Sequence, residues 1–287
     1  MYQVEHILSA QAELGEGPLW HPDEQVLYFL DITQGRLHRF DPAGGLHTVT
    51  DLGVVVGSMG VRAAGGWVMA TRAGLAFRDA DGQMTLIGDP DASENDEVRF
   101  NDGKTDPTGR FWAGKMGNGF TNSLYRLDPD CSIHRMESGI GVSNGLGWSP
   151  DLNTFYYTDS PAMKIYAYDY DAASGAISNR RDFAVVPAGG GQPDGLAVDA
   201  EGCLWSARWG GWKVVRYAPD GQVLAEIAMP VELPTSCAFG GPNLDELYIT
   251  SAYVDVPAER RAAQPLAGDV FRIRPGVRGL PEPKFKG

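Results

Sequence analysis

Short apolar runs alternate with turn-forming residues along the whole chain of 287 residues. The runs are rich in Val, Ile, Tyr and Trp, and the 37 Gly and 19 Pro residues are spread evenly between them. Runs of this kind, bounded by turn residues, are typical of β-strands, and no segment sustains the 3.6-residue periodicity of an amphipathic helix. The pattern predicts a fold built almost entirely of β-strands.

One unit of this pattern recurs six times. In each copy a turn leads into a strand that carries an aromatic residue, in the segments "HPDEQVLYF", "AAGGWVMA", "DPTGRFWAG", "SPDLNTFYYT", "DAEGCLWSA" and "GPNLDELYIT". The aromatic residues follow one another at steps of 39 to 49 residues, at Tyr28, Trp67, Trp112, Tyr156, Trp205 and Tyr248. A second strand follows in each copy, with an arginine at one fixed place in every copy except the fourth, at Arg39, Arg78, Arg126, Ala167, Arg216 and Arg272.

A repeat of this length, with several short strands in each copy, matches one blade of a β-propeller. A β-sandwich is the alternative, but it gives no reason for the same turn and aromatic residue to recur six times. The sequence therefore predicts an all-β fold, a six-bladed β-propeller that occupies residues 1–287 as a single domain. Because the first copy begins near residue 14 and the last ends near residue 275, we expect the N-terminal run "YQVEHIL" to add a strand to the last blade.

A polar residue lies six positions before the turn of each copy. These residues are Glu16, Ser58, Asn101, Asn144, Asp194 and Ser236, and a glycine directly follows three of them, at Gly17, Gly145 and Gly195. Equivalent positions in successive blades face the same place, so we expect these side chains to surround the propeller axis. The alternative is that Glu-Gly and Asx-Gly pairs before strands only shape turns.

The types of these residues indicate a metal site. Carboxylate and amide oxygens are the ligands that hard cations prefer, and several of them in a narrow channel need a partner. We therefore expect one divalent metal ion at the axis, with calcium or zinc as the first candidates and manganese, magnesium or iron as alternatives. The two serines, Ser58 and Ser236, would offer hydroxyl groups from the remaining blades.

Charge and cysteine content argue against several classes of partner and of structural site. The net charge of −13 and the isoelectric point near 4.8 argue against binding to nucleic acid or to an anionic membrane, because phosphate groups are bound by clustered Lys and Arg. Cys131, Cys203 and Cys237 are odd in number and widely spaced, so neither a disulfide framework nor a sulfur-ligated zinc site is predicted. With no signal-peptide pattern at the N-terminus, we expect a cytoplasmic protein.

Several segments in this order resemble the SMP-30/gluconolactonase/regucalcin-like family. They are "LGEGPLW", "RFNDGKTDPTGRFWAGKM", "SNGLGWSPDLNTFYYTDS", "QPDGLAVDAEGCLWSA", "SCAFGGPNLDELYITSA" and "QPLAGDVFRI", and the similarity runs from about residue 12 to 273. The resemblance implies a six-bladed propeller that hydrolyses a sugar lactone to the open aldonic acid. It also implies that Glu16, Asn144 and Asp194 are metal ligands, and that Arg99 and Asn101 contact the substrate.

One segment departs from the family pattern. The sequence "GKMGNGF" has Asn118 and Gly119 where vertebrate members carry acidic residues, so the sugar that the site takes is left open. Our hypothesis is metal-dependent hydrolysis of a sugar lactone, with Asp194 as catalytic general base as well as metal ligand. The rival hypotheses are a related metal-dependent esterase or phosphotriesterase and a non-enzymatic calcium-binding propeller.

Overall fold

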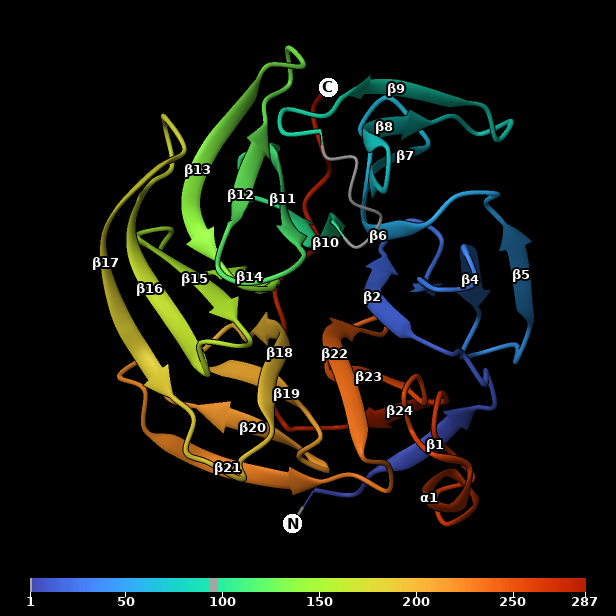
Figure 1. The fold of residues 1–287 in the computed structure, drawn as a ribbon. Coiled ribbons are helices and arrows are strands. Elements are labelled where there is room, and N and C mark those ends of the chain that lie inside the picture. Colours follow the sequence, from blue (N-terminus) through green and yellow to red (C-terminus); the bar gives the residue numbers. More distant parts are fainter. Residues whose placement is uncertain (1, 93–97) are drawn as a thin grey trace.

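Six four-stranded antiparallel sheets surround a central axis (Figure 1). This computed structural model describes residues 2–92 and 98–287. The prediction of an all-β, six-bladed propeller is confirmed. Within the described residues, α1 (Ala258–Ala262) is a short surface helix, and no helix there has both the length and the apolar character that a membrane span requires.

The strands of each sheet follow one another outward from the axis. The innermost strands are β2 (Gly15–His21), β6 (Val56–Val61), β10 (Arg99–Thr105), β14 (Ser143–Trp148), β18 (Gln192–Val198) and β22 (Leu233–Gly240). The second strands are β3 (Val26–Asp31), β7 (Trp67–Thr71), β11 (Phe111–Met116), β15 (Thr154–Asp159), β19 (Leu204–Trp209) and β23 (Glu246–Ala252). The third strands are β4 (Arg36–Phe40), β8 (Gly74–Arg78), β12 (Asn122–Leu127), β16 (Lys164–Asp171), β20 (Lys213–Tyr217) and β24 (Val270–Ile273). The outermost strands are β5 (His47–Asp51), β9 (Met84–Gly88), β13 (Ile133–Ile140), β17 (Ala176–Val185), β21 (Val223–Ala228) and β1 (Glu5–Leu8).

Both ends of the chain contribute to the closed ring. Strand β1, which lies within the run "YQVEHIL", pairs with β24 and so forms the outer edge of the sixth sheet. The C-terminal residues cross the face of the propeller at which the innermost strands end. On that face Gly279 pairs with Asp199, and Phe285 pairs with Arg62. Phe285 is fully buried there in a core cluster with residues of the second and third sheets.

The aromatic residue and the arginine that recur in the sequence form a cross-strand pair within each sheet, with an alanine in place of the arginine in the fourth. In all six sheets the aromatic residue of the second strand lies directly opposite the arginine-type position of the third, from Tyr28 and Arg39 in the first sheet to Tyr248 and Arg272 in the last. The guanidinium carbon of Arg216 lies 5.1 Å from the ring centroid of Trp205. Such pairs stabilise a sheet and fix its register, and the register positions the innermost strands.

Every innermost strand carries a β-bulge at the predicted polar position. The register with the second strand shifts between Glu16 and Leu19, Val56 and Ser58, Phe100 and Gly103, Asn144 and Leu146, Pro193 and Leu196, and Pro234 and Cys237. A bulge adds an unpaired residue, increases the local twist and redirects side chains. The six bulges therefore form one ring of altered backbone around the axis.

Candidate functional site

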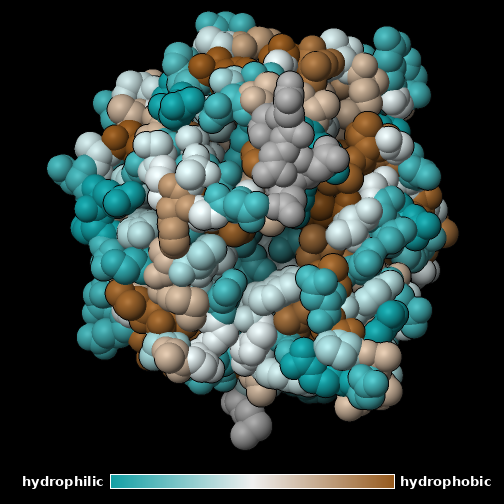
Figure 2. Space-filling model, in the orientation of Figure 1, coloured by the Kyte–Doolittle hydropathy of each residue, from teal (hydrophilic) through white to brown (hydrophobic). Residues whose placement is uncertain are grey.

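A cavity of about 200 Å³ lies at the N-terminal ends of the innermost strands. All five residues predicted to bind metal or substrate line it, namely Glu16, Arg99, Asn101, Asn144 and Asp194. The remaining lining residues are Leu14, Met116, Val142, Ser160, Gln192 and Trp209. On the face shown in Figure 2, the molecule is hollowed at the axis, with hydrophilic and hydrophobic surface around the hollow.

The two serines of the predicted ring do not line this cavity. Ser236 borders a smaller cavity of about 20 Å³ deeper along the axis, and its Oγ lies 2.0 Å from where a Cβ on Gly195 would be. The Oγ of Ser58 is likewise 2.6 Å from the Cβ position of Gly103. Both serines occupy the bulge position of their strands, but each packs against a glycine of the neighbouring blade and neither lines the 200 Å³ cavity.

Hydrogen bonds connect the polar residues of the cavity in sequence. Arg99 Nη1 donates to Asn101 Oδ1 at 2.7 Å, and Asn101 Nδ2 donates to Asn144 Oδ1 at 2.8 Å. Asn144 Nδ2 then donates to Ser160 Oγ, also at 2.8 Å. Asn101 and Asn144 come from adjacent blades, so these bonds fix neighbouring blades to each other at the cavity wall.

The carboxylates of the site are buried together. Glu16 is 8% exposed and Asp194 is 3% exposed. Burial, reinforced by the nearby Asp102 carboxylate, raises the pKa of Glu16 to about 8. Burial and the charges of Glu16 and Asp102 hold the pKa of Asp194 well above its usual range. Burial also lowers the pKa of Arg99 to about 10, although the Glu16 carboxylate opposes this effect.

This arrangement fits a divalent cation. Asp194 Oδ1 is buried and has no hydrogen-bond partner among the described residues. An unpaired buried carboxylate is costly unless a proton or a cation neutralises it. No histidine or cysteine lines the cavity in the described part of the chain, so oxygen atoms are the ligands on offer. Oxygen ligands suit hard cations such as Ca²⁺, Mg²⁺ and Mn²⁺.

Asp102 is a half-buried acid that could not be predicted from the repeat. It lies within the bulge of β10, accepts a hydrogen bond from Gly103 N at 2.7 Å, and borders the deeper cavity. Burial raises its pKa to about 6. The repeat identifies one polar residue per blade, which is Asn101 in the third blade. Asp102 directly follows Asn101, and this position beside a ring residue is the sequence signal that could have identified it.

Asn118 lies beside the cavity, at its rim. With Arg99 and Met116, which also line the central cavity, it borders an adjoining hollow of about 550 Å³. Gly117 and Arg72 line the same hollow. The position where an acidic residue was expected is therefore close to the predicted substrate-binding arginine, and it carries an uncharged amide.

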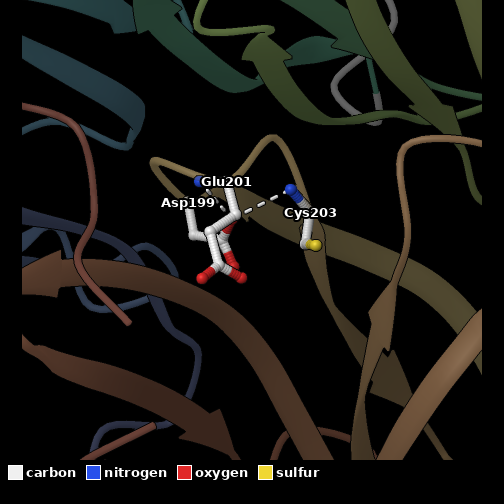
Figure 3. A group of neighbouring side chains, drawn as sticks. All are labelled: Asp199, Glu201 and Cys203. Carbon is white, nitrogen blue, oxygen red and sulfur yellow. Dashed lines mark hydrogen bonds between the residues drawn. The ribbon is translucent and has the colours of Figure 1, made fainter. Parts of the chain in front are cut away.

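A second group of potential metal ligands has a structural role. Asp199, Glu201 and Cys203 lie close together in the turn after β18 (Figure 3). Asp199 accepts hydrogen bonds from the backbone N–H groups of Glu201 and Cys203, from Trp205 Nε1 at 3.0 Å and from Arg216 Nη2 at 2.7 Å. Arg216 therefore already neutralises this carboxylate, and the group fixes the turn that begins the second strand of its blade.

The comparisons with known proteins agree with this architecture. The protein-family model described as SMP-30/gluconolactonase/LRE-like region matches residues 14–253 of the sequence. The chain is 44% identical to 6-deoxy-6-sulfogluconolactonase from Pseudomonas putida, over 96% of this chain and 95% of the relative. It is 39% identical to the pentonolactonase XacC from Haloferax volcanii, over 97% of each chain. The structure of a calcium-binding protein, regucalcin, from Agrobacterium tumefaciens superposes with a TM-score of 0.94 at 29% identity, over 100% of this chain and 98% of that one. The chain belongs to the SMP-30/gluconolactonase/LRE-like family.

Proposed function

We propose that this chain is a metal-dependent lactonase that hydrolyses an aldonolactone to the open-chain aldonic acid. Two relatives that align over nearly the whole chain are named as sugar lactonases. The observation that carries the proposal is that Glu16, Asn144 and Asp194 meet Arg99 and Asn101 in one cavity. Its volume of about 200 Å³ suits a small ligand.

Glu16, Asn144 and Asp194 would hold the cation. Two carboxylates supply charge and one amide supplies a neutral oxygen, and the unpartnered Oδ1 of Asp194 supports this assignment. When bound, a divalent cation there would polarise the lactone carbonyl and lower the pKa of a bound water. The calcium-binding neighbour supports a divalent metal in this family without identifying the ion that this chain uses.

Arg99 and Asn101 would orient the sugar. The described bonds of Arg99 to Asn101 Oδ1 and to Phe100 O both use Nη1, at 2.7 and 2.9 Å. The guanidinium is thereby held while Nε and Nη2 can donate to ring hydroxyls or to the charge that develops on the carbonyl oxygen. Donors fixed before the reaction stabilise such charge strongly.

Asp194 would be the general base. A water would attack the carbonyl carbon and pass a proton to Asp194; the bond from that carbon to the ring oxygen would then break, and Asp194 would return this proton to the ring oxygen, which leaves as a hydroxyl. Burial strengthens the carboxylate as a base, whereas a bound cation weakens it, so the two effects oppose each other at this residue.

A lactonase panel tests the proposal. Aldonolactones of five and six carbons are offered to the purified protein with a pH indicator, after chelation and after return of Ca²⁺, Zn²⁺, Mn²⁺, Mg²⁺ or Fe²⁺. We expect the active wild type to lose activity on chelation, and Asp194→Ala to be about 10²- to 10⁴-fold slower, the usual contribution of a general base. Asp220→Asn, in an exposed turn, is the matched control. The proposal fails if the wild type, supplied with each metal, hydrolyses none of the lactones faster than Asp194→Ala does.

A further inference from the structure

The hydrogen bonds along the cavity wall form a chain of fixed direction. The chain starts at the Arg99 guanidinium and passes through the amides of Asn101 and Asn144 to the hydroxyl of Ser160. From there Ser160 Oγ donates to the backbone carbonyl of Pro193 at 2.6 Å. Neither end can reverse, because a guanidinium only donates and a carbonyl only accepts.

Ser160 decides which way the Asn144 amide faces. A hydroxyl has one proton, and that of Ser160 is used on Pro193 O, so toward Asn144 the hydroxyl can only accept. Asn144 must therefore present its NH₂ group to Ser160. If the amide turned over, its oxygen would face the Ser160 oxygen and its NH₂ group would face the NH₂ group of Asn101, and both hydrogen bonds would be lost.

The other end of the chain imposes the same direction. Asn101 Nδ2 donates to the backbone carbonyl of Ser143 at 2.9 Å as well as to Asn144 Oδ1. Its Oδ1 accepts from Arg99, which has no acceptor to offer in return. The two amides are therefore oriented from both sides, and Asn144 keeps its oxygen on the side away from Ser160.

Ser160 also joins two blades. It is 4% exposed and directly follows β15 in the fourth blade, whereas Pro193 lies in β18 of the fifth blade and directly precedes Asp194. One hydroxyl thus contacts the amide of one proposed ligand and the backbone beside another. A hydroxyl can both accept from Asn144 and donate to Pro193 through a single small group, and only the thiol of Cys could do the same, more weakly.

We infer that Ser160 is a positioning residue that fixes Asn144 with its oxygen available to a divalent cation and sets the position of Asp194. This inference rests on the proposed metal site. It assigns Ser160 no contact with the reacting atoms. Partners of this kind typically contribute 10- to 100-fold to metal affinity.

Isothermal titration with Ca²⁺ and with Zn²⁺, without substrate, tests the role of Ser160. We expect Ser160→Ala to raise the cation Kd about 10- to 100-fold, and Ser160→Thr, which keeps the hydroxyl, to restore most of the affinity. Ser160→Cys fills the same space with a weaker acceptor, so its Kd should lie between these two. Ser251→Ala is the matched control, since Ser251 is as buried and donates to the backbone carbonyl of Asp269, yet it does not line the cavity.

Each outcome either supports or overturns the inference. A folded Ser160→Ala with a Kd within about twofold of wild type overturns it, since that change is well below the expected range. An equal loss of affinity in Ser251→Ala also overturns it, because the effect would then be general. If wild type itself binds neither cation, the proposed metal site fails; if wild type binds and Ser160→Ala is unaffected, the role of Ser160 alone fails.

Discussion

The cation-free protein should lose stability as the pH rises, and Glu16 allows the size of the effect to be worked out. Its pKa rises from 4.5 in the unfolded chain to about 8 in the folded chain, first because of burial and then because of Asp102. Between these values the folded state holds a proton that the unfolded state has released. The free energy of unfolding therefore falls with pH by about 1.4 kcal/mol per pH unit for this one proton.

The full effect builds up over about three and a half pH units. Stability present below pH 4.5 is lost progressively as the pH approaches 8, which amounts to roughly 5 kcal/mol from Glu16. Asp194, whose pKa is also raised, acts in the same direction. A bound divalent cation would displace these protons and neutralise the carboxylates. With excess Ca²⁺, the free energy of unfolding should therefore no longer fall with pH over this range.

Urea denaturation with and without chelator measures the slope. Glu16→Gln has no proton to release, so its cation-free slope should be smaller by about 1.4 kcal/mol per pH unit. At the upper end of this pH range the variant should therefore be more stable than the cation-free wild type, and it should also bind cations less tightly. Asp220→Asn should follow the wild type. The reasoning is refuted if Glu16→Gln keeps the wild-type slope, or if it is the less stable protein in chelator at the upper pH.

Three further substitutions separate the site from its scaffold. Arg99→Lys loses the planar fork beside Asn101, so kcat/KM for the lactone should fall about 10- to 100-fold in steady-state assays, with a far smaller change in cation affinity. Gly195→Ala places a Cβ 2.0 Å from Ser236 Oγ, and calorimetry should show roughly 1–3 kcal/mol lower stability. Adding Ser236→Gly should restore only part of it, because the Cα of residue 236 still lies 2.7 Å from the new Cβ. Phe285→Ala empties a fully buried position under the C-terminal segment and should cost about 3–5 kcal/mol in urea denaturation, with an unchanged cation Kd.

The blades could be predicted from sequence because their signals are local and repeated. A turn, an aromatic residue and an arginine at constant offsets describe one cross-strand pair, and each copy repeats the evidence for the others. The same logic located Glu16, Asn101, Asn144 and Asp194, since equivalent positions share one place relative to the axis. Periodicity carries this information without any knowledge of tertiary contacts.

Residues outside the repeat could not be found in this way. Ser160 lies in the turn after a second strand and reaches the cavity only because the fourth and fifth blades are adjacent. Asp102 is one residue away from the repeat position and points into the deeper cavity because of the bulge in β10. Ser58 and Ser236 occupy the repeat position, yet the neighbouring glycine determines where they pack. Each case depends on contacts between blades, which no pattern within one blade encodes.

Two of the glycines beside the polar ring do more than shape turns. If they only shaped turns, a left-handed backbone would be expected at each, but Gly145 and Gly195 lack a positive φ and only Gly17 has one, at 52°. What Gly145 and Gly195 share is proximity to the next blade. A Cβ on Gly145 would lie 2.6 Å from the carbonyl oxygen of Asp194, and one on Gly57 would lie 2.5 Å from that of Asn101. The missing side chains let each innermost strand approach its neighbour closely enough to bring these polar residues together at the axis. The two Asx-Gly pairs, at Gly145 and Gly195, are therefore better explained by the close approach of neighbouring blades than by turns, whereas Gly17 keeps the left-handed backbone expected of a turn.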